Sequence, residues 1–322
     1  MKKILLTNRY TAAPLEIIKE EVPRGFEIYF LTEQTQEALM SEVANADYIL
    51  AGGRLKITKE VLERARDLKM IQRSGVGLDT LDLDALRQKG IPLYVNQGVN
   101  AESVAEHTLL LMLACLRKLP TLDRNTKNGI WKKQEQGVQT AELKNKTVGV
   151  IGMGNVALRL LSLLKPFHVK ILYTNLFQMD PGFETENNMK FVGMDELMKG
   201  SDIVTVNCAL TDETRNLIDR GAINKMKRGA ILVNTARGEI VDSEAVADAL
   251  KEGKLAYAGL DVHCEEPIPE DYPLKTCDRA ILTPHIAGVT ADSFRAMMHD
   301  AFRNIACFDQ GRLEEIAPFR YL

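Results

Sequence analysis

A glycine-rich turn in the middle of the chain has the spacing of a nucleotide-binding turn. Residues 148–157 read VGVIGMGNVA, which contains a G-x-G-x-x-A pattern, and the helical pattern LRLLSLL follows. The first glycine permits a tight turn, and the second lets the backbone approach a pyrophosphate at a helix N-terminus. Gly152, Gly154, Asn155 and Val156 are therefore predicted to bind a dinucleotide. A turn that serves packing alone is the alternative.

The end of the next strand pattern bears on the choice between NAD and NADP. KILYTN ends at Asn175, 23 positions after Gly152, where an acidic residue is expected to bind the adenosine ribose 2′-hydroxyl of NAD. An asparagine can still bond that hydroxyl, and the following LFQMD offers no arginine for a 2′-phosphate. NAD is the predicted cofactor, and NADP is kept as the alternative.

A lone arginine stands among small residues in NTARGEIVD, residues 234–242, directly after the buried-strand pattern GAILV. Surface arginines mostly lie on helices, where their stems can spread. Arg237 at the carboxyl end of a strand therefore suggests a guanidinium held in a cleft, with a turn-side salt bridge as the alternative.

Two series of alternating strand and helix patterns must position these residues. The first contains the strand patterns KKILLTN, FEIYFLT, ADYILAG, LKMIQRSG and IPLYVN, with TKEVLERARD and DLDALRQKG as helices between them. The second contains KTVGVIGMG, VKILYTN, SDIVTVNC, AILVNTA, YAGLDV and AILTPH. Such alternation is typical of parallel sheets with crossover helices, so the sequence predicts an α/β fold with two units.

Helix patterns separate and close the two series. SVAE, from Ser103 to Glu106, is predicted to be a capping box ahead of the apolar helix HTLLLMLACLRK. Near the end of the chain, apolar residues recur three or four positions apart from Phe294 to Phe308, with Gly311 just beyond. This spacing predicts an amphipathic helix.

Composition and charge narrow the class of protein. A length of 322 residues favours about two domains. The net charge of −3, without a concentrated basic stripe, argues against nucleic acid as a partner. The longest apolar run, Leu109 to Leu116, is too short for a membrane span. Five cysteines without a C-x-x-C pair favour reduced thiols in the cytoplasm, and the histidine spacing indicates no metal site.

Motifs along nearly the whole chain resemble the D-isomer-specific 2-hydroxyacid dehydrogenases. They are, in the same order and spacing, RSGVGLDTLD, NAESVAEHT, VGVIGMGNV, NTARGEIVD, AGLDV followed by EEP, and LTPHIAG. The resemblance implies two doubly wound parallel-sheet domains. A flavodoxin-like substrate domain would comprise residues 1–100 and 294–322, and a Rossmann-type NAD-binding domain would comprise residues 101–293. It also implies reversible reduction of a small 2-oxo acid to the D-2-hydroxy acid, by a homodimer.

The same resemblance assigns a catalytic triad. Arg237 would clamp the substrate carboxylate, because a planar and always charged guanidinium suits that contact. His285 would exchange the proton with the substrate oxygen, a task suited to histidine. Glu266 would hydrogen-bond the imidazole and favour its protonated form. A loop histidine and a solvated turn are the structural alternatives for His285 and Glu266.

Further contacts follow from the matched motifs. The backbone N–H groups of Gly75, Val76 and Gly77 would bind the other side of the substrate carboxylate. Residues near the nicotinamide half would be Thr108, Thr235, Ala236, Asp261, His285 and Gly288. Residues near the adenosine half would be Cys208, Ala209 and Thr214, in addition to Asn175.

Substrate identity stays open among glyoxylate or hydroxypyruvate, lactate-type and phosphoglycerate chemistry. Gly52 and Gly53 stand where phosphoglycerate-type members often carry polar side chains, which argues against a phosphorylated substrate, although Arg54 and Arg73 leave it open. A non-catalytic NAD(H) sensor or a corepressor-like protein on the same scaffold is the alternative function.

Overall fold

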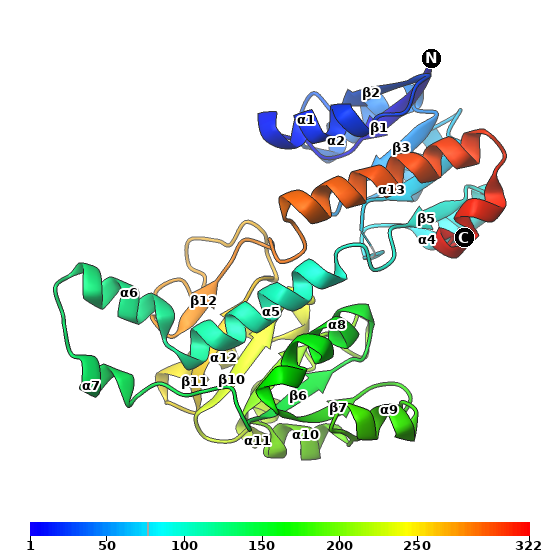
Figure 1. Cartoon of the computed structure of the whole chain (residues 1–322). Coiled ribbons are helices and arrows are strands. Elements are labelled where there is room, and N and C mark those ends of the chain that lie inside the picture. The colour runs from blue at the N-terminus through cyan, green and yellow to red at the C-terminus, as the bar shows by residue number, and fades with distance from the viewer. Residues whose placement is uncertain (76) are drawn as a thin grey trace. The chain divides into compact units, whose positions relative to one another are not determined.

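The computed structural model describes residues 1–75 and 77–322, which divide into two compact units (Figure 1). One comprises Met1–Asn100 with Val289–Leu322, and the other comprises Ala101–Gly288. The later boundary lies between Gly288 and Val289, whereas the sequence analysis predicted it between residues 293 and 294. The reason is that helix α13 already begins at Ala291, after its N-cap Thr290, whose side chain forms a capping box with Ser293.

The first unit is a five-stranded sheet in the order β2-β1-β3-β4-β5, and its strand pairs are parallel. Its strands are β1 (Lys2–Leu6), β2 (Phe26–Phe30), β3 (Tyr48–Ala51), β4 (Met70–Arg73) and β5 (Leu93–Val95). Its helices are α1 (Ala12–Glu21), α2 (Gln36–Glu42), η1 (Val43–Asn45), α3 (Lys59–Arg64), α4 (Leu83–Lys89), α13 (Ala291–Asp309) and η4 (Leu313–Phe319). This strand order is the flavodoxin-like one, as predicted.

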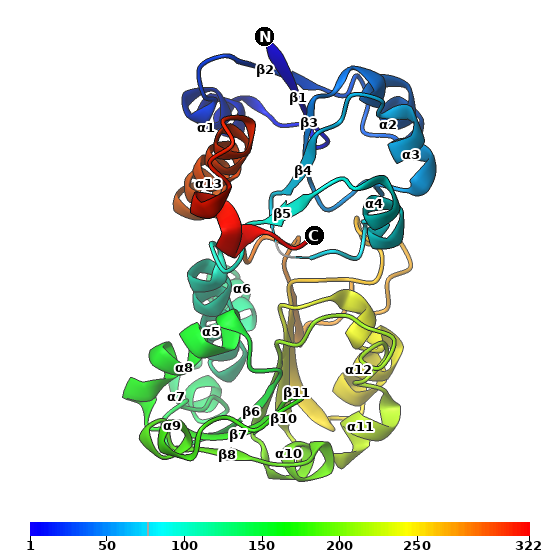
Figure 2. The same ribbon diagram turned by 90° about the vertical axis from the view of Figure 1, so that its right-hand side faces the viewer.

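Helices cover both faces of the first sheet. Figure 2 shows α1 and α13 on one face and α2, α3 and α4 on the other. Neighbouring residues of β1 serve opposite layers, because side chains alternate along a strand. Ile4 packs in the cluster that contains Phe302 of α13, whereas Leu5 packs in the cluster that contains Leu62 of α3. The first sheet therefore has an apolar core on each face, in keeping with the predicted parallel sheet and crossover helices.

The second unit is a seven-stranded sheet in the order β12-β11-β10-β9-β6-β7-β8, again with parallel pairs. Its strands are β6 (Thr147–Ile151), β7 (Lys170–Thr174), β8 (Met189–Phe191), β9 (Ile203–Val206), β10 (Ala230–Asn234), β11 (Leu255–Leu260) and β12 (Ala280–Leu282). Its helices are α5 (Ala101–Leu116), α6 (Leu119–Lys127), α7 (Lys133–Gly137), α8 (Asn155–Leu164), η2 (Lys165–Phe167), α9 (Pro181–Glu186), α10 (Met194–Gly200), α11 (Arg220–Lys225), η3 (Gly238–Ile240) and α12 (Ser243–Lys251). The order matches the Rossmann fold, extended by one strand.

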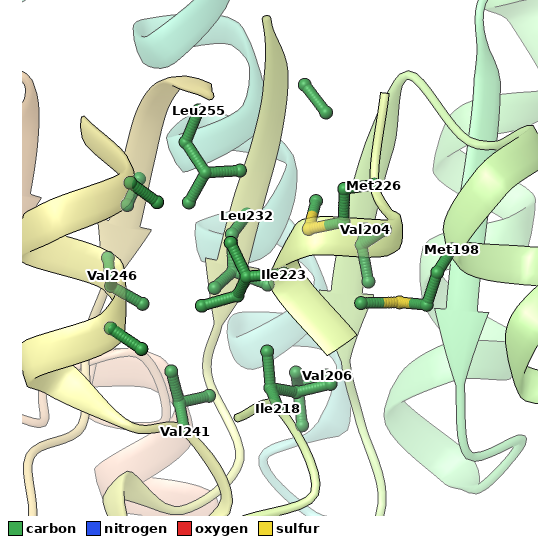
Figure 3. Close-up of a cluster of buried hydrophobic side chains, with 14 of the residues drawn as sticks. Met198, Val204, Val206, Ile218, Ile223, Met226, Leu232, Val241, Val246 and Leu255 are labelled. Carbon is green, nitrogen blue, oxygen red and sulfur yellow. The ribbon is translucent and has the colours of Figure 1, made fainter. Parts of the chain in front are cut away.

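The second sheet separates two apolar cores. Leu232 of β10 belongs to the core under α10, α11 and α12, where it lies near Ile223 and Val246 (Figure 3). Its neighbours Ile231 and Val233 belong to the opposite core, which α5 and α8 cover. Because the strands are parallel, their carboxyl ends meet at one edge of the sheet, and the segments that follow these ends carry most of the predicted site residues.

Two details of the second unit differ from the sequence predictions. Helix α5 begins at Ala101, so Ser103 lies in its first turn and the predicted capping box at Ser103 is wrong. Asn100, a residue type favoured before a helix, directly precedes it. The three-residue strand β8 was not predicted, because Met189–Phe191 is too short to form a recognisable apolar run. Among the described residues, no helix is long and apolar enough to cross a membrane.

Candidate active site

The turn between β6 and α8 requires glycine at Gly152. Its φ of +89° lies in the left-handed region that residues with a side chain rarely adopt. A Cβ at this position would lie 2.6 Å from the Cα of Cys208, after β9. Strands β6 and β9 are the neighbours at which the strand order reverses, the place where ligands bind in such sheets. The turn is therefore held against the segment that would line the other side of the cofactor.

The N-terminus of α8 combines open space with uncapped N–H groups. Gly154 is the N-cap residue, with φ −89° and ψ −169°, and no side chain of the described residues caps the helix. A Cβ on Gly154 would meet no described atom within 4 Å. Asn155 and Val156 form the first turn of this helix. Because helix N-termini favour anions, the turn fits the pyrophosphate of a dinucleotide.

An unused hydrogen-bond donor lies at the same edge. The Nδ2 atom of Asn207, which follows β9, is buried without a partner among the described residues. Its Oδ1 atom accepts a hydrogen bond from Thr205 Oγ1 at 3.1 Å. Because an unpaired buried donor is costly, an acceptor group of a bound ligand would suit this amide.

Asn175 closes the turn after β7. Its Oδ1 accepts a hydrogen bond from the N–H of Met153 at 3.3 Å, and its Nδ2 donates to the carbonyl of Phe177 at 3.3 Å. Leu176 and Phe177 are exposed beside it. The side chain therefore links the segment after β7 to the glycine-rich turn.

Three of the predicted adenosine-side residues lie in one loop after β9. Thr214 Oγ1 donates to the carbonyl of Ala209 at 2.7 Å and accepts the N–H of Thr211 at 2.7 Å, which closes the loop. Burial raises the pKa of the Cys208 thiol, which packs against the core. Contact of Cys208, Ala209 and Thr214 with a cofactor stays a prediction.

Arg237 is positioned by a buried asparagine at the end of β10. Asn234 Nδ2 donates to the carbonyl of Arg237 at 2.8 Å, and Asn234 Oδ1 accepts the N–H of Ala236 at 3.0 Å. The guanidinium Nη1 of Arg237 donates to the carbonyl of Ala236 at 2.7 Å. Both ends of one amide thus fix the turn that carries the arginine.

Gly238 brings the arginine turn against the segment that carries Glu266. A Cβ on Gly238 would lie 2.0 Å from the carbonyl carbon of His263 and 2.4 Å from the N atom of Cys264. Any side chain at Gly238 would push these backbones apart. The sequence Arg237-Gly238 therefore sets how closely the arginine turn approaches the loop after β11.

His285 and Glu266 form a direct pair. The Nδ1 atom of His285 lies 2.8 Å from Oε2 of Glu266, and their side chains are 47% and 37% exposed. Oε1 of Glu266 accepts the N–H of His263 at 3.1 Å. Partial burial raises the pKa of Glu266, but the hydrogen bonds and charges of His285 and His263 together lower it below its ordinary value.

Asp261 anchors the loop that carries His285. Its buried carboxylate accepts Thr283 Oγ1–H at 2.6 Å and the N–H groups of Ile286 and Ala287 at 2.9 Å each. The backbone carbonyl of Asp261 accepts the N–H of His285 at 2.7 Å. These bonds hold His285 at a φ of +54°, which is uncommon for a residue with a side chain. The structure thus gives Asp261 a positioning part; its predicted cofactor contact stays a prediction.

Two threonines meet beside this loop. Thr108 of α5 is buried; its Oγ1 lies 2.8 Å from Oγ1 of Thr235 and donates to the carbonyl of Val104 at 2.7 Å. Because the Thr108 hydrogen is used on Val104, Thr235 donates to Thr108. Thr235 directly precedes Ala236 and Arg237, so helix α5 is tied to the arginine turn. Contact of Thr108, Thr235, Ala236 and Gly288 with the nicotinamide half stays a prediction.

The predicted substrate loop belongs to the first unit. Gly75 follows β4, and a Cβ there would meet no described atom within 4 Å. Val76 lies outside the described residues, so the predicted backbone cradle of Gly75, Val76 and Gly77 stays a prediction. Arg73, at the end of β4, is only 4% exposed and donates to the carbonyl of Gly52.

Sequence reasoning missed four residues that organise the second unit's site. They are Asn234, His263, His107 and Thr283, each joined to the arginine turn or to the histidine loop. His107 Nε2 lies 3.1 Å from Thr283 Oγ1, although 176 positions separate the residues. Polar residues at the ends of predicted strands could have indicated these positions. The hydrogen bonds between distant loops, however, become known only from the three-dimensional structure. No group of three or more potential metal ligands occurs among the described residues.

The sequence matches the family description "D-isomer specific 2-hydroxyacid dehydrogenase, NAD binding domain" over residues 109–287. The D-3-phosphoglycerate dehydrogenase of Archaeoglobus fulgidus is 38% identical over 296 residues, which cover 90% of this chain and 54% of that protein. The chain thus spans about half the length of this relative. The glyoxylate reductase of Thermofilum pendens is 37% identical over 284 residues, 87% of this chain and 83% of that protein.

A solved structure is similar over almost the full length. The D-lactate dehydrogenase of Aquifex aeolicus, complexed with NAD and lactic acid, has a TM-score of 0.86 and 28% identity. The match covers 99% of this chain and 98% of that chain.

Proposed function

Since this chain belongs to the D-isomer specific 2-hydroxyacid dehydrogenase family and carries its NAD-binding domain, we propose that it is an NAD-dependent oxidoreductase that interconverts a small 2-oxo acid and the D-2-hydroxy acid. The 2.8 Å contact between His285 and Glu266 carries this proposal. It lies in the same unit as the Gly152 turn, so a proton-transfer pair and a dinucleotide turn occur on one sheet.

His285 donates the proton when the 2-oxo group is reduced. Its Nδ1 is engaged by Glu266, which leaves Nε2 as the ring nitrogen that meets the substrate oxygen. A carboxylate on Nδ1 orients the ring and stabilises the positive charge that the donor must carry. In the oxidation direction, Nε2 of the neutral ring accepts the proton of the hydroxyl group.

Arg237 binds the substrate carboxylate. Its turn is fixed by Asn234, so little freedom remains to be lost when the acid binds. A guanidinium can bind both carboxylate oxygens at once, which orients the 2-oxo carbon. The proposal also includes the carboxylate contact that the family resemblance implies for the backbone N–H groups of Gly75, Val76 and Gly77.

Bound NAD(H) supplies or accepts the hydride. The turn from Gly152 to Val156 holds the pyrophosphate, Asn175 the adenosine ribose, and Asn207 Nδ2 donates to an acceptor group of the cofactor. Thr108, Thr235, Ala236, Asp261 and Gly288 surround the nicotinamide half. Cys208, Ala209 and Thr214 line the adenosine half.

NAD is used in preference to NADP. The segment from Asn175 to Met179 contains no basic residue, and Asn175 already holds the glycine-rich turn through Met153. A 2′-phosphate would meet no cation on this segment. The preference is therefore for a cofactor with a free 2′-hydroxyl.

The substrate is a small 2-oxo acid without a phosphate, such as glyoxylate, hydroxypyruvate or pyruvate. Gly52 and Gly53 have no side chain that could bind a phosphate at the end of β3. Arg73 is buried, and its guanidinium donates a hydrogen bond to the carbonyl of Gly52. A Cβ on Gly53 would be 3.5 Å from Arg73 Nη2, so this arginine lies under the glycine pair. A phosphate would therefore need a different cation.

The active form is a homodimer. Large apolar side chains are exposed on the α6–α7 segment and its flanks, where Trp131 is 81% and Val138 is 83% exposed. Leu110, on α5, is also exposed. Exposed apolar side chains in such number favour a protein partner, and a second copy of the chain fits the family. Light scattering after size exclusion tests this, and a monomer at all concentrations would refute it.

A spectrophotometric assay tests the function. Loss of NADH absorbance is followed with glyoxylate, hydroxypyruvate, pyruvate, longer 2-oxo acids and 3-phosphohydroxypyruvate, each repeated with NADPH. Turnover of an unphosphorylated acid with NADH is the expected result. Turnover of 3-phosphohydroxypyruvate alone would refute the substrate proposal, and higher efficiency with NADPH would refute the cofactor preference. NADH binding without turnover of any 2-oxo acid would refute the proposal that the protein is an enzyme.

A further inference from the structure

One buried residue is hydrogen-bonded both to Glu266 and to the loop that carries His285. His263 is 7% exposed and lies between the two segments. Its backbone N–H donates to Glu266 Oε1 at 3.1 Å. Its ring Nε2 lies 3.1 Å from the carbonyl oxygen of Thr283, two residues before His285. His263 is thus joined to the glutamate through its backbone and to the histidine loop through its side chain.

The partners of the His263 ring fix where its hydrogen lies. A carbonyl oxygen only accepts, so Nε2 carries the hydrogen and donates to Thr283. Nδ1 lies 3.2 Å from the hydroxyl of Tyr272, which can donate to it. Ser243 Oγ, 3.2 Å from the same hydroxyl, then donates to the Tyr272 oxygen. In this arrangement the Nε2 hydrogen of His263 and the hydroxyl hydrogen of Tyr272 each have one acceptor.

Thr283 is held from a second side as well. Its hydroxyl hydrogen goes to Asp261 at 2.6 Å, so the hydroxyl oxygen accepts from His107 Nε2 at 3.1 Å. The backbone carbonyl, by contrast, is the group that His263 binds. Loss of the His263 ring would therefore leave the Asp261 contacts in place and free only the carbonyl side of the loop.

We propose that His263 is a positioning residue that holds the separation and orientation of His285 and Glu266, with its Nε2–H donor directed by Tyr272. This inference rests on the proposed function, because it assigns His263 a part in the same proton transfer. It does not place His263 in contact with substrate or cofactor.

Four variants test the proposal. His263→Phe keeps an aromatic ring against Tyr272, whose ring centroid lies 5.4 Å away, but removes both ring hydrogen bonds. His263→Gln restores a donor that can reach the Thr283 carbonyl. Tyr272→Phe removes only the hydroxyl that directs the His263 hydrogen. Ser243→Ala, at the outer end of the chain of bonds, is the matched control.

The expected result is a loss of kcat without a loss of cofactor binding. His263→Phe should lower kcat by roughly 10- to 100-fold, the scale on which misplaced catalytic groups act, while NADH affinity stays within about twofold because the cofactor turn is untouched. His263→Gln should recover most of the loss, and Tyr272→Phe should show a smaller one. A kcat within twofold of wild type for His263→Phe, or an equal loss for His263→Phe and His263→Gln, would overturn the proposal.

Two further measurements keep the test decisive. Long-range ¹⁵N–¹H NMR of the protein without cofactor should show His263 protonated on Nε2, and protonation on Nδ1 alone would overturn the proposal. If His263→Phe does not fold, Tyr272→Phe becomes the test variant, and a kcat equal to that of wild type would then overturn the positioning role of His263. An inactive wild-type protein would instead refute the proposed function, and the positioning part with it, whereas an active wild type with unaffected variants refutes this inference alone.

Discussion

Nδ1 of His285 lies 2.8 Å from Oε2 of Glu266, and the two residues belong to loops that follow the neighbouring strands β12 and β11. Parallel pairing puts the carboxyl ends of both strands at the same edge of the sheet, so residues 19 positions apart can meet there. The buried carboxylate of Asp261 fixes the histidine loop, and the N–H of His263 fixes the glutamate. The pair is therefore built by the sheet and two short loops.

Glu266→Gln should reduce kcat by about 10²-fold or more, because the amide cannot stabilise the charged imidazole as a carboxylate does. Cofactor affinity should stay unchanged, since the cofactor turn lies on other strands. Steady-state kinetics and NADH fluorescence measure the two effects. The matched control is Glu265→Gln, a neighbouring exposed carboxylate. Equal activity of the two variants would contradict the role of Glu266.

Arg237→Lys should raise KM for the 2-oxo acid by at least about tenfold, because a point charge cannot reproduce a two-point contact with a carboxylate. The melting temperature should change little, since Asn234 binds the backbone of Arg237 and not its side chain. Arg228→Lys serves as the control, because Arg228 is exposed and its guanidinium donates to the carbonyl of Glu252. A KM unchanged by Arg237→Lys would contradict carboxylate binding.

Gly154→Ala should weaken NADH binding by about tenfold or more without unfolding the protein, because the added methyl group enters the open space in which a pyrophosphate would lie. Gly193→Ala is a matched control. Gly193 is also the N-cap of a helix, α10, with open space around a Cβ. Gly152→Ala should instead destabilise the protein by about 1–3 kcal/mol through its clash with Cys208. Equal NADH affinity for Gly154→Ala and Gly193→Ala would contradict the site.

The lowered pKa of Glu266 predicts how stability changes with pH. A carboxyl group with a folded-state pKa below its unfolded value stabilises the fold above the unfolded pKa and loses this effect as pH falls through the folded pKa. Wild type should exceed Glu266→Gln in free energy of unfolding near neutral pH, by less than about 1 kcal/mol because both side chains are partly exposed. The difference should shrink as pH falls below the ordinary value of 4.5 and disappear once pH lies below the lowered folded-state pKa of Glu266. Urea unfolding across this range measures it; a difference that grows on acidification would contradict the pairing.

Much of the fold could be predicted from the sequence, because strands buried on both faces are short apolar runs and helices carry apolar residues three or four positions apart. The eleven longer strand patterns alternate with helix patterns, and each predicted strand occurs in the sheets. The Gly152 turn was recognisable because its strand, its glycines and its helix are contiguous. Strand β8 and the start of α5 were missed, because three residues form no recognisable apolar run and both Asn100 and Ser103 are N-cap residue types.

The candidate site was less readable, because its order comes from contacts between distant segments. His263 stands next to Cys264 and Glu265 in the sequence, and nothing there indicates that its ring reaches Thr283. Asn234 was predicted only as the last residue of a strand, whereas its side-chain amide forms hydrogen bonds with the backbone of Ala236 and Arg237. Such hydrogen bonds depend on which strands are neighbours, and that becomes known only with the sheet order.

The configuration of the product is the sharpest test of the proposed D-specific reaction. Hydroxypyruvate and pyruvate are each incubated with NADH and the wild-type protein, and the hydroxy acid formed is resolved by chiral chromatography, with His285→Gln in parallel. We expect D-glycerate or D-lactate as the single enantiomer, and a rate at least about 10²-fold lower for His285→Gln. An L product, a racemic product, or His285→Gln as active as wild type would contradict it.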